Sequence, residues 1–257
     1  MSGVLFCSRG WEDRLSKLPL EGRVALITGG AKRIGRSITE KLAAEGADVA
    51  VDYSTSRNEA DALVAALQKL GRRAVAVRAD VSKKHDVDEM IASVRKEFGR
   101  LDILVNNAGM FFPSEFTELK EDQWDKIMDT NLKSQFLCSQ AAAPLLKSSG
   151  HGHIINISSL GGMLPWPKYT HYCVSKAGVI MLTRCLARAL APEVLVNSVA
   201  PGTIQFPDEA PDEEYIRRAP LHRTGKGSDI ADAVFYFATS DFVTGQILVV
   251  DGGRALT

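Results

Sequence analysis

Two polar residues in the second half of the chain have the types and spacing of an acid–base pair. Tyr172 and Lys176 are four positions apart in a segment expected to be helical, so their side chains share one face. A free tyrosine phenol has a pKa of about 10, and a neighbouring ammonium favours the phenolate and lowers that value. The pair could therefore transfer a proton, although a YxxxK match alone also arises by chance on a helix surface.

A glycine-rich turn provides a second chemical feature. Residues 28–35 read TGGAKRIG and directly follow the first predicted strand. Glycines at a strand-to-helix turn let the backbone approach a pyrophosphate, and the next helix offers free N–H groups and the positive end of its dipole. Its place in a βαβ unit favours a dinucleotide site over a simple tight turn. The predicted cofactor contacts in this turn are Gly29, Lys32, Arg33, Ile34 and Gly35.

These motifs lie on a chain that alternates short β-rich runs with amphipathic helices. That pattern is typical of an α/β domain with a parallel sheet covered on both faces. Strands are predicted at 23–28, 48–53, 73–78, 103–106, 153–157, 195–199 and 246–250, and helices at 34–45, 58–70, 84–98, 122–146, 171–190 and 228–238. The segment 201–226 is too long for a simple connection, so we expect a lid or substrate loop there.

Further motifs stand at the ends of these elements in a defined order. The run NNAG at 106–109 follows the fourth strand, Ser159 follows the fifth, and Asn131 lies within the helix at 122–146. With the glycine turn, YxxxK and the Pro-Gly pair at 201–202, this set closely resembles the short-chain dehydrogenase/reductase family from about residue 20 to 253. The resemblance implies a single Rossmann-like domain, doubly wound, with helices on both faces and strand order 3-2-1-4-5-6-7.

The same resemblance implies an NAD(P)-dependent oxidoreductase and assigns the catalytic roles. Tyr172 would be the proton donor, and Lys176 would activate it and hold the nicotinamide ribose. Ser159 would hydrogen-bond the carbonyl oxygen and stabilise the charge that develops there. Asn131 would hold a water that links Lys176 to solvent, its alternative role being to bend or cap the helix. The nicotinamide supplies hydride, and the protein aligns the reactants.

The predicted cofactor is NADP(H). Lys32 and Arg33 suggest an additional negative charge, such as a 2′-phosphate. Asp52 could instead mark an NAD site, but Asp52 and Tyr53 face opposite ways on a strand, and the resemblance makes Tyr53 the ribose-facing residue. Other predicted cofactor contacts are Ser54, Thr55 and Ser56 at the phosphate, Asp80 and Val81 at the adenine, and Asn107, Ala108, Gly109, Pro201, Gly202, Thr203 and Ile204 towards the nicotinamide.

Two subfamilies compete for the substrate. Arg33 in the glycine turn, Phe111 in the run 106–113 and the stretch 201–207 are similar to pteridine reductases, in which an aromatic at the position of Phe111 stacks on the pterin. Ser159 argues the other way, because trypanosomatid pteridine reductases have Asp there, and Ser suits a ketone. Phe111, Trp166 and Phe206 could equally line a general apolar cleft for the substrate.

We therefore predict reduction of a ketone, similar to that by 3-oxoacyl-carrier-protein reductases. Reduction of a dihydropterin C=N bond is the alternative. The substrate partner would be a small-molecule carbonyl compound, an acyl thioester or a pterin. A non-catalytic NADP(H)-binding sensor is a third possibility, disfavoured because such proteins usually lack the Tyr or the Lys, and this chain has both.

Composition limits the remaining partners. The 31 basic and 31 acidic residues balance, which argues against nucleic acid as the main partner. No apolar run approaches the roughly 20 residues of a membrane span, and no metal-ligand cluster is evident. Residues 1–19 do not resemble a signal peptide, so we expect a flexible extension, a reductase domain over 20–257 and a cytoplasmic location. The resemblance also implies a homotetramer.

Overall fold

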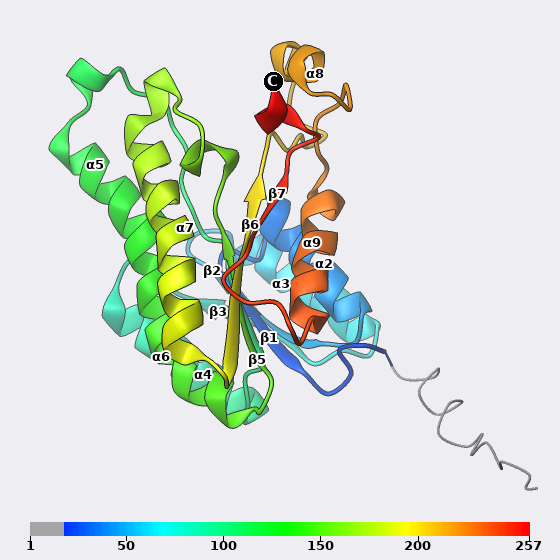
Figure 1. Cartoon of the computed structure of the whole chain (residues 1–257). Coiled ribbons are helices and arrows are strands. Elements are labelled where there is room, and N and C mark those ends of the chain that lie inside the picture. The colour runs from blue at the N-terminus through cyan, green and yellow to red at the C-terminus, as the bar shows by residue number, and fades with distance from the viewer. Residues whose placement is uncertain (1–17) are drawn as a thin grey trace, which may run out of the picture.

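The computed structural model describes residues 18–257 and contains one seven-stranded parallel sheet. Its order, β3-β2-β1-β4-β5-β6-β7, confirms the predicted topology (Figure 1). The predicted strands are all present, with ends that shift by two residues or fewer. Their bounds are Val24–Ile27 (β1), Asp48–Tyr53 (β2), Ala74–Arg78 (β3), Ile103–Asn106 (β4), Gly152–Ile157 (β5), Val194–Pro201 (β6) and Ile247–Val250 (β7).

Helices cover both faces of the sheet, so the central strands are buried on both sides and consist almost wholly of apolar residues. Each face has its own apolar core, which the adjacent helices complete. One layer contains α2 (Arg33–Ala44), α3 (Arg57–Lys69) and α9 (Gly227–Thr239); the other contains α4 (Lys84–Phe98), α6 (Ser134–Ser148) and α7 (Thr170–Leu190) (Figure 1).

The strand register brings the chemically interesting loops to one edge of the sheet. Ile27 at the end of β1 is level with Val51 of β2 and Val105 of β4. Val105 is in turn level with Ile155 of β5. Because all strands are parallel, the loops after β1, β2, β4, β5 and β6 open at the same carboxyl edge, where ligands bind in sheets of this kind.

The helix expected at 122–146 is interrupted. It begins as α5 (Glu121–Met128), passes through a π-helical turn at Asp129–Lys133, and continues as α6. Asn131, in the middle of this turn, is completely buried, and its amide bonds the loop after β4 and helix α7. A π-turn adds a residue to one turn of a helix, and here it accompanies these tertiary hydrogen bonds.

The segment expected to be irregular, 201–226, contains a short helix, α8 (Glu213–Arg218), above the carboxyl ends of β6 and β7 (Figure 1). Asp212 caps this helix by accepting from the Tyr215 amide at 2.9 Å. The Tyr215 hydroxyl donates to the Asp251 carbonyl oxygen at 2.6 Å. The segment is thus a cover anchored to the sheet, consistent with its predicted lid position.

The structure describes only the last residues of the predicted amino-terminal extension. Leu20 is buried, and its amide donates to the Glu45 carbonyl oxygen at 2.8 Å, so the packed domain includes residue 20. The predicted extension falls almost entirely outside the described residues and stays a prediction. Within residues 18–257, no helix combines the length and apolarity needed to cross a bilayer.

Candidate active site

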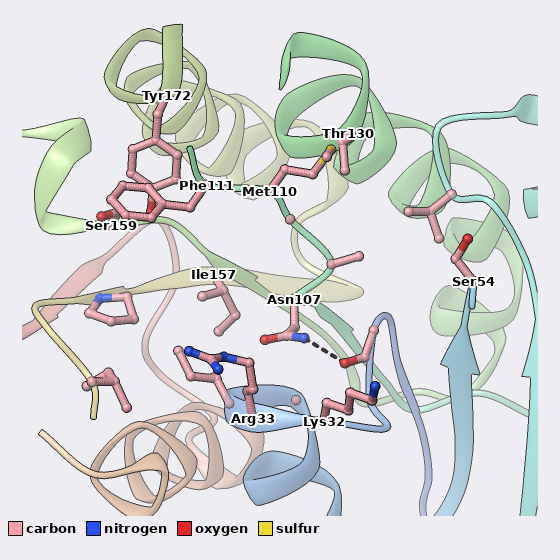
Figure 2. A pocket seen from close by; sticks show the side chains of 18 of the residues that line it. Lys32, Arg33, Ser54, Asn107, Met110, Phe111, Thr130, Ile157, Ser159 and Tyr172 are labelled. Atoms are coloured by element: carbon pink, nitrogen blue, oxygen red, sulfur yellow. Dashed lines mark hydrogen bonds between the residues drawn. The ribbon is translucent and has the colours of Figure 1, made fainter. Parts of the chain in front are cut away.

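A cavity of about 1280 Å³ opens at the carboxyl edge of the sheet. Apart from Asn131, every residue predicted to contact cofactor or substrate lines this cavity (Figure 2). They come from the turn after β1, the loops after β2 to β6, the amino-terminal turns of α7 and the cover segment. Residues more than a hundred positions apart thus meet in one space large enough for a dinucleotide together with a small substrate.

The glycine turn is packed against the loop after β4. Gly29 has a left-handed φ of 59°, and a Cβ there would lie 3.2 Å from the Ala108 Cα. The Thr28 hydroxyl accepts from the amides of Asn107 and Ala108, at 2.9 and 3.0 Å. Asn107 Nδ2 donates to the carbonyl oxygens of Thr28 and Gly29. These bonds keep the turn open towards the cavity and allow close approach of a phosphate group.

Both cations of the turn are paired with carboxylates. Lys32 Nζ lies 2.6 Å from Glu59 Oε1 in the first turn of α3. Arg33 pairs with Glu209 of the cover segment. Arg33 also begins α2, has a left-handed φ of 53°, and places its guanidinium 4.7 Å from the centre of the Phe206 ring.

Asp52 lies beneath the glycine turn. Its side chain is buried, and Oδ2 accepts from the Gly29 amide at 2.9 Å. Oδ1 has no hydrogen-bond partner among the described residues. Burial raises the pKa of this carboxyl group to about 7. Asp52 therefore supports the turn, while the neighbouring Tyr53 and residues 54–56 continue along the cavity wall.

The three central catalytic candidates meet at the other end of the cavity. Lys176 is buried, and its Nζ donates to the Ile157 carbonyl oxygen at 2.8 Å and lies 5.8 Å from the centre of the Tyr172 ring. The Ser159 hydroxyl accepts from the Gly161 amide at 3.0 Å. Figure 2 shows Ser159 and Tyr172 close together, with Phe111 beside them.

Burial controls the protonation of this group. It raises the pKa of Tyr172 to about 12, against the lowering effect of the hydrogen bond with Ser159. It also lowers the pKa of Lys176 to about 8. The predicted lowering of the tyrosine pKa is not seen, because desolvation of the phenolate outweighs the hydrogen bond with Ser159. At neutral pH the phenol retains its proton, as a proton donor must.

Asn131 lies behind the cavity wall. Its Oδ1 accepts from the Met110 amide at 2.7 Å, and its Nδ2 donates to the Met110 carbonyl oxygen and the Ser175 hydroxyl. A Cβ on Gly109 would lie 3.3 Å from Asn131 Oδ1 and 3.7 Å from Lys176 Nζ. Asn131 thus ties together the surroundings of Lys176, and its water-holding role stays a prediction.

Aromatic side chains form the wall beside Tyr172. The Phe111 ring is 57% exposed and stacks parallel to Tyr169, with centres 4.4 Å apart. The Phe111 ring also makes an edge contact with Tyr172, with ring centres 4.8 Å apart. The Trp166 ring lies nearly parallel to that of Tyr172, with centres 6.0 Å apart. A flat or apolar substrate would find matching surface here.

Sequence reasoning missed some participants. Met110 lines the cavity and bonds Asn131, yet it follows the NNAG run without a signal of its own. Tyr169 supports Phe111 from the turn before α7. Glu209 has no local signal either, because its partner Arg33 is 176 residues earlier in the chain.

Comparison with known proteins places this arrangement in a family. A family model described as enoyl-(acyl carrier protein) reductase matches residues 29–255. The 3-oxoacyl-[acyl-carrier-protein] reductase FabG of Staphylococcus epidermidis is 40% identical over 238 residues, covering 89% of this chain and 97% of that protein.

Solved structures agree with that placement. A short-chain dehydrogenase/reductase from Serratia marcescens has a TM-score of 0.88 and 34% identity, covering 92% of this chain and 99% of its own. A blue fluorescent protein from a metagenomic library, solved in complex with NADPH, has a TM-score of 0.88, 36% identity and the same coverage. The chain belongs to the short-chain dehydrogenase/reductase family, and it is an oxidoreductase.

Proposed function

We propose that this protein is an NADP(H)-dependent reductase that converts a ketone to an alcohol, with Tyr172 as the proton donor. The observation that carries the proposal is the shared cavity: Tyr172, Ser159 and the buried Lys176 line the same space as the glycine turn. One end can hold a dinucleotide, and the other has a protonated phenol beside a hydroxyl. Hydride and proton donors can therefore meet at one carbonyl group.

The residues of the cavity fit NADP(H). The glycine turn and the amino terminus of α2 would hold the pyrophosphate, and Lys32 with residues 54–56 would hold the 2′-phosphate. Tyr53 stands where an NAD enzyme would need an acid, and Asp52 is engaged with the Gly29 amide. The metagenomic neighbour solved with NADPH supports the same choice.

When bound, the cofactor supplies a hydride to the carbonyl carbon. Ser159 and Tyr172 hydrogen-bond the carbonyl oxygen, and the phenol proton moves to that oxygen as the alcohol forms. The resulting phenolate is stabilised by the Lys176 ammonium, which the Ile157 carbonyl holds in place. Asn131 would then hold the water through which a proton returns from solvent.

Replacing the phenol tests this mechanism. Tyr172→Phe keeps the ring and its contacts with Phe111 and Trp166. We expect NADPH to bind with an affinity close to that of the wild type, while kcat falls by at least about a thousandfold. Fluorescence titration measures binding, and NADPH oxidation measures turnover. Near-normal turnover by this variant would remove Tyr172 as the donor.

A 3-oxoacyl thioester is the first substrate to examine, because FabG of Staphylococcus epidermidis is named for that activity. Two of the basic side chains of the cover segment that could receive an acidic carrier protein are already paired, Arg218 with Glu214 and Arg223 with Asp229. We therefore expect the thioester itself, more than its carrier, to be recognised. NADPH oxidation with acetoacetyl thioesters, diketones, a quinone and dihydrobiopterin ranks the substrate classes.

Reduction of a dihydropterin is the second candidate. The exposed face of Phe111 next to Tyr172 favours it, because a flat heterocycle could stack there. Ser159 in place of an acid favours the ketone. A strong preference for dihydrobiopterin in the panel would reverse this order, and NADPH binding without any turnover would point to a sensor.

We also propose a homotetramer. Two separate surfaces expose large apolar side chains, one on the α6 and α7 layer and one around α9 and β7. The first contains Phe136, Val174 and Met181, and the second contains Tyr236, Phe242 and Leu248. Two self-complementary surfaces on one chain are what a tetramer with crossed two-fold axes requires.

A further inference from the structure

Arg33 and Glu209 connect two walls of the cavity that are otherwise far apart in the chain. Arg33 stands in the glycine turn, at the start of α2. Glu209 lies in the cover segment before α8. Both side chains line the cavity and form an ion pair. In Figure 2 the Arg33 guanidinium points away from its own turn, towards the middle of the cavity.

The carboxylate of Glu209 is held from both sides. One oxygen meets Arg33, and the other accepts from the Phe206 amide at 3.0 Å. The Gln205 amide group donates to the Glu209 carbonyl oxygen at 3.2 Å. Residues 205–209 therefore form a compact turn with its carboxylate aimed at Arg33.

Phe206 belongs to the same contact. The Arg33 guanidinium lies 4.7 Å from the centre of its ring, a distance at which a cation and an aromatic face attract each other. Arg33 thus holds the cover segment by an ion pair and by a stacked ring. A movement of the guanidinium would move Phe206, a predicted substrate contact.

The backbone of Arg33 has an unusual conformation. Its φ of 53° lies in the left-handed region, which is unfavourable for a side chain with a Cβ and open to glycine. An arginine at such a position needs a compensating interaction, and the Glu209 and Phe206 contacts provide one. The guanidinium also has five donors, so one edge can face a carboxylate while another faces a phosphate.

We propose that Arg33 and Glu209 form a clasp across the dinucleotide cleft, which opens for NADP(H) to enter or leave and which sets the position of Phe206 when closed. The inference rests on the proposed function for the identity of the cofactor. Both side chains remain partly exposed, 53% for Arg33 and 34% for Glu209, and a solvated ion pair of this kind is weak enough to open in each cycle. Glu209 is therefore a positioning residue.

The rates of NADPH exchange test the clasp. In Glu209→Gln the charge is lost and the size is kept, so we expect association and dissociation of NADPH to accelerate together, each by about threefold or more. Stopped-flow fluorescence measures both rates without any substrate. Asp208→Asn makes the same charge change one residue away, on an exposed side chain, and should leave both rates as in the wild type.

Two alternatives give different results. If Glu209 only competes with a cofactor phosphate, association accelerates and dissociation stays constant or slows, and the clasp is refuted. If the pair only stabilises the fold, neither rate changes, which refutes it too. The double variant Arg33→Gly/Glu209→Gln should dissociate NADPH no faster than Arg33→Gly alone, because each single change already opens the same contact. Additive effects would overturn the proposal.

A second readout needs no cofactor. Hydrogen exchange of residues 203–212 in the free protein should be faster in Glu209→Gln than in Asp208→Asn, because the Phe206 amide loses its charged acceptor. Equal hydrogen exchange in the two variants would contradict the clasp.

Failure of the clasp and failure of the proposed function give different results. A wild type that binds NADPH but reduces no carbonyl would remove the proposed function and leave the clasp intact. If the wild type turns over fully and Glu209→Gln has unchanged rates of NADPH association and dissociation, only the clasp is refuted.

Discussion

At the scale of single residues, burial changes the chemistry that residue types suggest. Lys176 and Tyr172 would both be protonated in water at pH 7. Because both side chains are buried, their pKa values shift in opposite directions: that of Lys176 falls to about 8, and that of Tyr172 rises to about 12. The ammonium is thus close to losing its charge, while the phenol holds its proton firmly. In the proposed reaction, the phenolate would therefore form only as the proton is transferred to the substrate, and Lys176 would stabilise it.

The effect of burial on Asp52 can be tested through the pH dependence of the free energy of unfolding. An unfolded aspartate releases its proton near pH 4, whereas the folded carboxyl group keeps it up to about pH 7. Between these values the folded state binds more protons, so this group's contribution to the free energy of unfolding decreases as pH rises. Asp52→Asn removes that dependence and keeps an acceptor for the Gly29 amide. We expect the variant to gain on the order of 4 kcal/mol relative to the wild type between pH 4 and pH 7, with no further change above.

Urea denaturation of both proteins across that pH range measures the difference. A gap that stays constant with pH would show that Asp52 does not titrate between the two values. NADPH binding provides a separate check. The side-chain oxygen of the Asp52→Asn variant can still accept from the Gly29 amide, so the affinity for NADPH should change little.

At the scale of elements, the relative positions of the candidate catalytic residues depend on how closely α7 approaches the turn after β5. That turn is a short 3₁₀ helix, Leu160–Gly162, directly after Ser159. A Cβ at Gly162 would lie 2.8 Å from both the carbonyl carbon and the oxygen of Lys176, which are backbone atoms of α7. The absence of a side chain at this position therefore sets the separation between Ser159 and the helix that holds Tyr172.

Gly162→Ala should push these two elements apart. We expect kcat to fall by about tenfold or more and the midpoint of thermal unfolding to decrease by several degrees. Gly178→Ala, a change on α7 itself, is the matched control. There the nearest atom, at 2.6 Å, is a terminal carbon of Leu132, which can rotate away, so the loss should be smaller. An equal effect of both changes would mean that general packing, and not the Ser159–α7 distance, is responsible.

At the scale of the whole molecule, the exposed apolar surfaces predict the assembly. Four copies of the 27.9 kDa chain give a particle of about 112 kDa, measurable by light scattering after gel filtration. Met181→Glu places a charge on the α6 and α7 surface, where that side chain is 56% exposed, and should yield a dimer of about 56 kDa. Leu70→Glu, at the isolated and 70% exposed end of α3, should leave the mass unchanged. A monomeric wild type would contradict the proposed tetramer.

Much of the fold was predictable because its signals are local. Runs of apolar residues marked the seven strands, and glycines such as Gly99, which has a left-handed φ of 77°, marked where helices end. The site was predictable in a different way. The glycine turn, Ser159 and the Tyr172–Lys176 pair each stand at the end of a predicted element, and parallel strands bring such ends to one edge.

The sequence by itself determined the topology and the cavity's main residues, since its ordered motifs resemble those of one family and stand at the ends of predicted elements. The tertiary structure alone decided the protonation of Tyr172 and Lys176, because desolvation depends on what packs around them. It also decided the π-turn at Asn131 and the pairing of Arg33 with Glu209. Those contacts join residues far apart in the chain, and no pattern within either segment can indicate which partner it will meet.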